Sequence, residues 1–317
     1  MRRDLAASIL DEGDFGALSG GAESLRGWLA IAKGDYAAAL THLEAAAKLF
    51  GSDVYAECNV LRTAANLARE MYMPSVMARV MHRVSRIEWT PYLQVPRFHI
   101  MRSAAWFRAM EGDYGGAMRM LGEIASLDIP DHWRLYTFCD RAYFSFVLGE
   151  DVNGWVTAEE AMALADRVEW DRCTGGEIVG LLYIVNLFAL KRPLDAQRYW
   201  KLYEALTPSD PQIRAAMSAE PSVDAWEAYT AGLLEKGLGN TAAAAANFNR
   251  AYSLYRKIRF EWRAVLTLLA QRDITPDDAS YDEYVESVLR RFPNSWLRRI
   301  AEHERRRRGP VSVGSIA

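Results

Sequence analysis

The chain has 317 residues, of which half are apolar and a quarter are charged, and its formal net charge is −3. These values are ordinary for a folded protein and give no general attraction to nucleic acid. No apolar run reaches the roughly 18–20 residues of a membrane span, and three well-separated cysteines indicate reduced thiols, so we expect a cytoplasmic protein without membrane contact.

The first 20 residues are expected to form an N-terminal cap that holds one short helix and a glycine-rich run. The segment from Met1 to Asp4 lacks the apolar stretch of a signal peptide. A repeat array is then predicted over residues 21–292.

A short phrase recurs along this array. It reads Gly34-Asp35-Tyr36-x-x-Ala39, then Gly112-Asp113-Tyr114-x-x-Ala117, and more weakly Gly239-Asn240-Thr241-x-x-Ala244. Three further alanines mark degenerate copies between them: Ala78, Ala158 and Ala196. The markers recur about every 39 residues, which is the signature of a repeat architecture.

Each unit has the features of a helical hairpin. Gly-Asp is turn chemistry, because glycine tolerates the positive φ that ends many helices. The small alanine lets the second helix approach closely, and apolar residues follow it at helical spacing. Gly27 and Gly232, which precede the turns, would let the first helix lie close to its neighbour. The pattern predicts an all-α protein of six hairpins plus a seventh terminal pair.

Several segments depart from the period. Residues 207–222 contain prolines near both ends and predict an inserted loop or short extra helix, after which Ser222 would cap a helix over 223–236. The apolar run 178–190 predicts a buried first helix. Thr275-Pro276-Asp277-Asp278 predicts another helix start. A basic capping helix is expected over 293–308 and a disordered tail over 309–317.

The repeats resemble the tetratricopeptide family over roughly residues 20–292, although the period exceeds the usual ~34 residues. The long units, and the segments 259–264 and 291–297, are similar to the helical sensor arms of bacterial LuxR-type and MalT-like transcription regulators. The resemblance implies a tetratricopeptide-like superhelix, an α-solenoid. The helix-turn-helix domain expected after such an arm is absent here, so the resemblance implies either a fragment or a stand-alone relative.

The resemblance also implies a binding face. In a tetratricopeptide superhelix the first helix of each pair lines the concave side, and the markers place six residues on or near that side: Trp28, His99, Arg102, Trp106, Trp226 and Tyr229. Aromatic and arginine side chains are favoured at interface hot spots. The alternative is that these rings fill the gaps between long helices.

Catalytic and metal-binding chemistry has little support in the sequence. The five histidines have no carboxylate or cysteine at metal-ligand spacing, and a packed histidine is the simpler interpretation of His82. Cys173 could be a nucleophile at a helix start, but no histidine lies near it in the sequence. We therefore expect no catalytic residue, no metal and no cofactor.

An arginine cluster near the C-terminus has three interpretations: a solvated helix, a linker that meets DNA backbone, or a segment that docks on acidic surface. Nucleic acid would be bound only through an absent domain or weakly through six arginines: Arg298, Arg299, Arg305, Arg306, Arg307 and Arg308.

The expected function is that of a non-catalytic scaffold that binds a protein, a peptide or a small effector. The resemblance favours the sensor or interaction module of a bacterial LuxR-type transcription regulator that lacks its DNA-binding domain. The alternative is a stand-alone cytoplasmic adaptor or scaffold unrelated to transcription.

Overall fold

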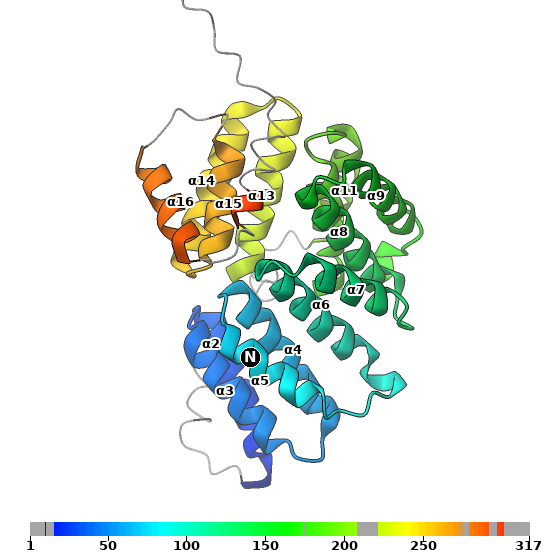
Figure 1. Ribbon diagram of the computed structural model, residues 1–317, viewed down its shortest axis with the longest axis vertical. Coiled ribbons are helices and arrows are strands. Elements are labelled where there is room, and N and C mark those ends of the chain that lie inside the picture. The colour runs from blue at the N-terminus through cyan, green and yellow to red at the C-terminus, as the bar shows by residue number, and fades with distance from the viewer. Residues whose placement is uncertain are drawn as a thin grey trace, which may run out of the picture. The chain divides into compact units, whose positions relative to one another are not determined.

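The computed structural model describes Leu10 and residues 16–173, 175–207, 221–272, 274, 279–291 and 297–300. Every regular element in this part of the chain is a helix (Figure 1), and none is long and apolar enough to cross a membrane. The chain divides into two compact units. The first holds residues 1–108, 115–130 and 215–221, and the second holds residues 109–114, 131–214 and 222–317.

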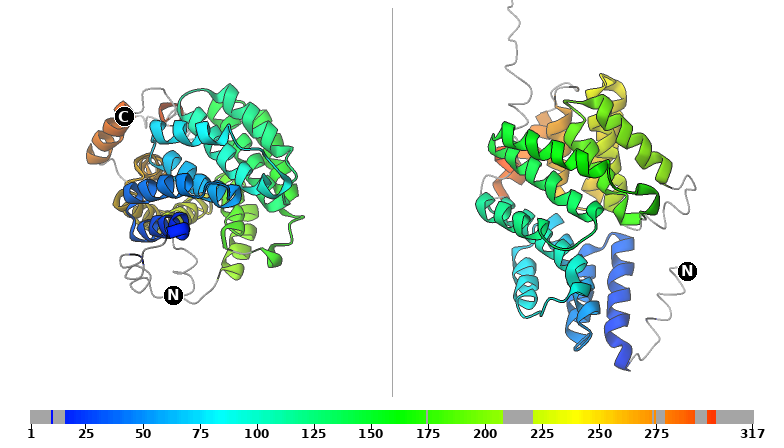
Figure 2. Two further views of the ribbon diagram at one scale, coloured as in Figure 1. Left: turned by 90° about the horizontal axis from the view of Figure 1, so that it is seen from below. Right: turned by 90° about the vertical axis from the view of Figure 1, so that its right-hand side faces the viewer.

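The first unit begins with two helical hairpins. Within it α2 packs against α3, α3 against α4, and α4 against α5, and the dark blue helices α2 and α3 lie side by side in Figure 2. Its elements, including the two helices that cross the boundary to the second unit, are η1 (Gly16–Leu18), α2 (Ser19–Lys33), α3 (Tyr36–Leu49), α4 (Val54–Glu70), α5 (Pro74–Val84), η2 (Pro91–Leu93), α6 (Gln94–Met110) and α7 (Tyr114–Ala125).

The second unit has four successive helix pairs around one core. Buried side chains from α8, α9, α10, α11, α13, α14 and α15 form a single apolar cluster. The elements are α8 (Asp131–Leu148), α9 (Asp151–Ala165), η3 (Trp170–Arg172), η4 (Gly175–Glu177), α10 (Gly180–Phe188), α11 (Pro193–Leu206), α13 (Pro221–Gly237), α14 (Thr241–Lys257), α15 (Glu261–Gln271) and α16 (Ala279–Arg291).

The turns within the hairpins use left-handed backbone, as the glycine pattern predicts. Gly34, Gly112 and Gly239 have φ of 76°, 88° and 84°. The amide of Gly34 donates to the Ile31 carbonyl, which closes the end of α2. Tyr72 has the corresponding place after α4, with φ of 50°, although its side chain makes that conformation costly. The second hairpin therefore has the same turn without the glycine.

The alanine markers occupy buried positions in most units. Five of them are completely buried: Ala39, Ala117, Ala158, Ala196 and Ala244. Ala78 is exposed, and the preceding residue Met77 is buried on the inner side of α5. The prediction that Ala78 marks a close helix contact is therefore wrong. The longer methionine occupies the buried place, so residue size alone misplaced the marker by one.

The two glycines predicted at close approaches do lie against neighbouring side chains. A Cβ atom added to Gly27 would lie 3.0 Å from Leu43, and one added to Gly232 would lie 2.6 Å from Phe248. These contacts join α2 to α3 and α13 to α14. Small residues thus set the distance between the two helices of a hairpin.

Other boundaries differ from expectation or cannot be compared. Helix α13 begins at Pro221, so Ser222 lies inside it and does not precede it as a cap. The buried helix predicted over 178–190 is α10, which covers only Gly180–Phe188. Much of the N-terminal cap, the insertion after residue 207, the helix start at 275–278 and the tail 309–317 lie outside the described residues, as does most of the basic segment 293–308. The tetratricopeptide-like superhelix remains a prediction.

Candidate partner-binding surface

Five aromatic side chains on the first helices of the second unit form a continuous series, which we call the aromatic row: Trp133, Tyr136, Tyr183, Trp226 and Tyr229. The ring centroids of successive members are 5.6, 4.7, 5.5 and 5.7 Å apart. Helix α8 supplies the first two rings, α10 the third and α13 the last two. Such spacings are typical of aromatic pairs in contact. The row therefore extends over three consecutive first helices.

Hydrogen bonds hold these helices against one another. Asn186 on α10 donates through Nδ2 to Thr230 Oγ1 on α13 at 2.6 Å, and also to the Leu182 carbonyl at 2.7 Å. Lys236 at the end of α13 donates to the Ala270 carbonyl at the end of α15 at 2.7 Å. Both contacts join first helices of neighbouring hairpins. The Asn186–Thr230 contact fixes the relative position of the rings that α10 and α13 carry.

One end of the row lies beside a partly buried contact between a histidine and a glutamate. The His132 ring meets Trp133 edge-on at 5.0 Å, and its Nε2 lies 3.3 Å from Glu177 Oε1. Burial lowers the pKa of His132, and the Glu177 carboxylate opposes that shift. The Tyr136 hydroxyl donates to the Gly176 carbonyl at 2.9 Å. The segment η4 thus anchors the start of the row.

An arginine covers the other end. The guanidinium carbon of Arg263 on α15 lies 4.4 Å from the centre of the Trp226 ring and 4.1 Å from that of Trp262. Both distances are within the range of a cation–π interaction. The Trp226 Nε1–H is buried and has no hydrogen-bond acceptor within the described part of the chain. The row therefore combines flat apolar faces, a cation and an unused donor.

The rings remain partly accessible in spite of their mutual contacts. Trp133, Tyr183, Trp226 and Tyr229 are half-buried, and only Tyr136 is buried. Rings of this kind can cover apolar or aromatic side chains. The row is thus suited to binding and contains no nucleophile paired with a base.

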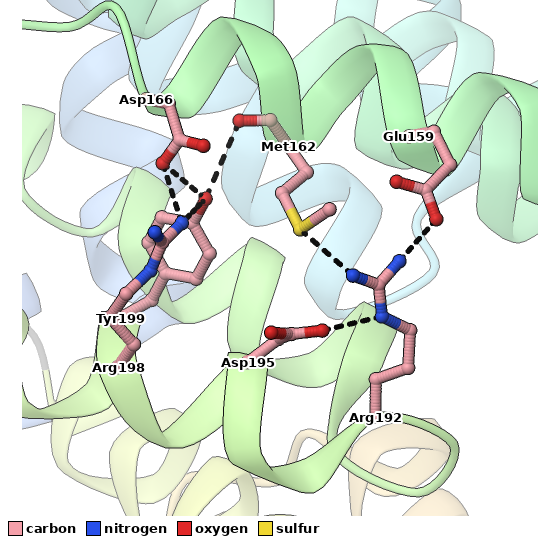
Figure 3. A network of polar contacts seen from close by, with 7 residues as sticks. All are labelled: Glu159, Met162, Asp166, Arg192, Asp195, Arg198 and Tyr199. Atoms are coloured by element: carbon pink, nitrogen blue, oxygen red, sulfur yellow. Dashed lines mark hydrogen bonds and ion pairs between the residues drawn. The ribbon is translucent and has the colours of Figure 1, made fainter.

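The second helices of the same hairpins carry a network of charged groups instead (Figure 3). Arg192 contacts Glu159 and donates to Asp195, and the Tyr199 hydroxyl donates to Asp166 at 2.7 Å. These contacts link α9 to α11, and burial together with the Asp166 carboxylate raises the pKa of Tyr199. The network gives the second-helix side a structural role.

The structure divides the six predicted binding residues between the two units. Trp226 and Tyr229 are members of the row. Trp28 on α2 is 40 % exposed, and His99 on α6 is half-buried. Arg102 and Trp106 are only 6 % and 8 % exposed. For this pair, burial favours the alternative interpretation, in which the side chains fill space between helices.

Sequence reasoning missed Trp133, Tyr136, Tyr183 and Arg263. One signal was available, because Trp133-x-x-Tyr136-Thr137 and Trp226-x-x-Tyr229-Thr230 have the same pattern, and both threonines are completely buried. Tyr183 has no such signal, since it lies inside the apolar run that predicts a buried helix.

Neither Cys58 nor Cys173 has surroundings that lower the pKa of its thiol. Burial and the carboxylates of Glu177 and Asp171 raise the pKa of Cys173, and burial raises that of Cys58 to about 11. Both shifts reduce the thiolate fraction that nucleophilic attack requires. No group of three or more His, Cys, Asp or Glu side chains in the described chain is placed to hold a metal ion.

The described part of the arginine cluster is solvated. Arg298 and Arg299 are exposed, between the buried Leu297 and Ile300. The Arg299 guanidinium lies 5.4 Å from the centre of the Tyr114 ring. The arginines at 305–308 lie outside the described residues.

Comparisons of the chain with protein-family models, with curated proteins and with solved structures found no match. A function must therefore be inferred from the surface itself.

Proposed function

We propose that this chain is a non-catalytic helical-repeat scaffold whose aromatic row binds an extended segment of a partner protein. The observation that carries the proposal is the continuity of the row, in which five rings from α8, α10 and α13 follow one another at 4.7–5.7 Å. A row that crosses several helices suits a ligand that also extends across them.

The chemistry of the row supports a peptide ligand. Tryptophan and tyrosine bury large areas at a modest cost in side-chain entropy, which is why they are enriched in interface hot spots. The Trp226 Nε1–H has no acceptor among the described residues, and because it is buried a peptide carbonyl would reach it only if the indole turned outward on binding. Arg263 adds a cation beside that donor.

The resemblance of the repeats to sensor arms supports a narrower proposal, in which the scaffold is the sensor or interaction module of a LuxR-type transcription regulator within a superhelical array. The narrower proposal predicts that the partner or effector changes the affinity of the intact regulator for its operator DNA. An intact gene product with no DNA-binding domain would instead assign the chain to the adaptor class.

The test begins with peptides selected from a displayed random library against the whole chain. Their dissociation constants are then measured by calorimetry for the wild type, Trp226→Ala and Trp200→Ala. Trp200 is a matched control, because it is a half-buried tryptophan on the second helix α11, where it contacts Tyr203 at 5.7 Å.

Trp226→Ala should weaken binding at least ~30-fold, since a central aromatic anchor is worth roughly 2 kcal/mol or more. Trp200→Ala should leave the affinity unchanged. Thermal melting of each variant separates lost binding from lost folding. Selected peptides that bind Trp226→Ala as tightly as the wild type would place the binding surface elsewhere.

A further inference from the structure

A cavity of about 690 Å³ opens in the first unit, far along the chain from every member of the aromatic row. It forms where the start of α4, the end of α5 and the segment 86–93 meet. Its volume is within the roughly 300–1,000 Å³ of sites for small molecules. None of the proposed peptide-binding residues lines it.

Two tyrosines and an apolar base shape the cavity. Tyr55 is 58 % exposed and Tyr92 is 87 % exposed, and both line the opening. Val54, Ile87 and Leu93 supply the apolar lining. Most of each phenol ring therefore remains in water after folding, and a bound molecule would remove that surface from water.

One of the two lining arginines is already neutralised. Arg83 donates through Nε to Glu57 Oε1 at 2.7 Å and through a terminal nitrogen to the Ala47 carbonyl at 2.8 Å. The carboxylate of Glu57, which also lines the cavity, is occupied by this pair. Neither group is available as a charged contact for a ligand.

The second arginine retains its charge. A terminal nitrogen of Arg86 lies 2.7 Å from His82 Nε2, and the guanidinium contacts no carboxylate in the described part of the chain. The imidazole accepts this hydrogen bond without supplying a negative charge, so it orients the guanidinium and leaves its other donors for a ligand. Glu88 is the remaining charged residue of the lining, and it disfavours a second negative charge on that ligand.

We propose that this cavity binds a small organic monocarboxylate with an aromatic body. The carboxylate pairs with Arg86, whose planar fork matches the two oxygens, and the ring packs against Tyr55 and Tyr92. With this site, the repeat scaffold would bind a small effector as well as a peptide partner. It does not depend on the aromatic row, so either proposal can fail alone.

The test compares two probes of the same shape, 3-phenylpropionate and the uncharged 3-phenylpropanol, by ligand-observed NMR titration of the whole chain. The carboxylate should bind at least about tenfold more tightly than the alcohol, because charge-assisted hydrogen bonds exceed neutral ones. Arg86→Gln should abolish this preference. Arg79→Gln is the matched control, since Arg79 is an exposed arginine on the neighbouring helix α5 that pairs with Glu44 outside the cavity.

Tyr92→Ala should weaken both probes, because it removes a wall and no charge. Glu88→Gln should leave the affinity for the carboxylate unchanged or increase it. A zwitterionic ligand would instead lose affinity, because its cation would pair with Glu88. The proposal would be overturned by the wild-type protein alone if it bound the carboxylate and the alcohol with equal affinity, or if it showed no saturable binding of the carboxylate. A preference that survives Arg86→Gln in a folded protein would overturn the assignment of the anion to this arginine.

Discussion

The stability of Gly232→Ala tests how closely α13 packs against α14 beneath the aromatic row. Gly232 lies within α13, and an added Cβ would be 2.6 and 2.7 Å from two ring carbons of Phe248 on α14. Contacts under 3.0 Å essentially never occur for a real Cβ, so a group must move. Phe248 is completely buried, and the centroid of its ring lies 6.1 Å from that of Tyr229 in the row.

Two opposing terms determine the expected change in stability. Replacing glycine by alanine within a helix stabilises it by roughly 0.8–1 kcal/mol. Overpacking a filled core costs typically 1–3 kcal/mol, and the enclosed Phe248 ring has little room to yield. We therefore expect Gly232→Ala to lower the free energy of unfolding by up to about 2 kcal/mol.

A double-mutant cycle with Phe248→Ala supplies the control within the same unit, because removal of the ring removes the clash. Gly232→Ala should stabilise that background by up to about 1 kcal/mol, so the sign of its effect reverses. Urea unfolding followed by circular dichroism measures all four proteins. Gly122→Ala on α7, where an added Cβ meets nothing within 4 Å, measures the propensity term alone. Equal stabilisation in both backgrounds would refute the close contact of α13 with α14.

Two further predictions concern a turn and a titration. Arg259 is exposed and has a φ of 60°. Arg259→Gly should raise the free energy of unfolding by about 1 kcal/mol, because left-handed backbone costs a non-glycine residue roughly 1–2 kcal/mol. An unchanged urea midpoint would argue against that conformation. The pKa of His132 is lower in the folded protein than in the unfolded chain, so the unfolded state binds the extra proton, and stability should fall as the pH drops below about 6.5 towards the folded pKa. His132→Gln should reduce the dependence of the melting temperature on pH between pH 6.5 and 5. A dependence equal to that of the wild type would assign the acid sensitivity to other groups.

The hairpins were predictable because their turns have a local cause. A glycine that ends one helix and an acid or amide that follows it form a pattern within six residues, and Gly34, Gly112 and Gly239 all adopt the required positive φ. Tyr72 and Arg259 adopt the same conformation without that signal. A pattern built on glycine therefore does not find these two turns.

The binding surface was harder to predict because it depends on which helices meet. Trp226 and Tyr229 were found from their place before a marker alanine. Tyr183 contacts Trp226 across 43 positions of sequence, and it joins the row only because α10 packs on α13. Arg102 was predicted on the partner-binding face, yet its side chain is buried. A residue type favoured at interfaces is also favoured in gaps between long helices, and only three-dimensional placement separates the two.

The most direct test of the aromatic row as a binding surface is the response of tryptophan indole N–H resonances to a selected peptide in ¹⁵N–¹H NMR. The Trp226 Nε1–H has no described acceptor, whereas Trp170 Nε1–H already donates to the Ala165 carbonyl at 2.9 Å. Assignment comes from Trp226→Phe, Trp133→Phe and Trp170→Phe. The Trp226 and Trp133 resonances should shift together and saturate at one dissociation constant, while that of Trp170 stays in place. Saturable binding that leaves both row resonances unmoved would contradict this prediction.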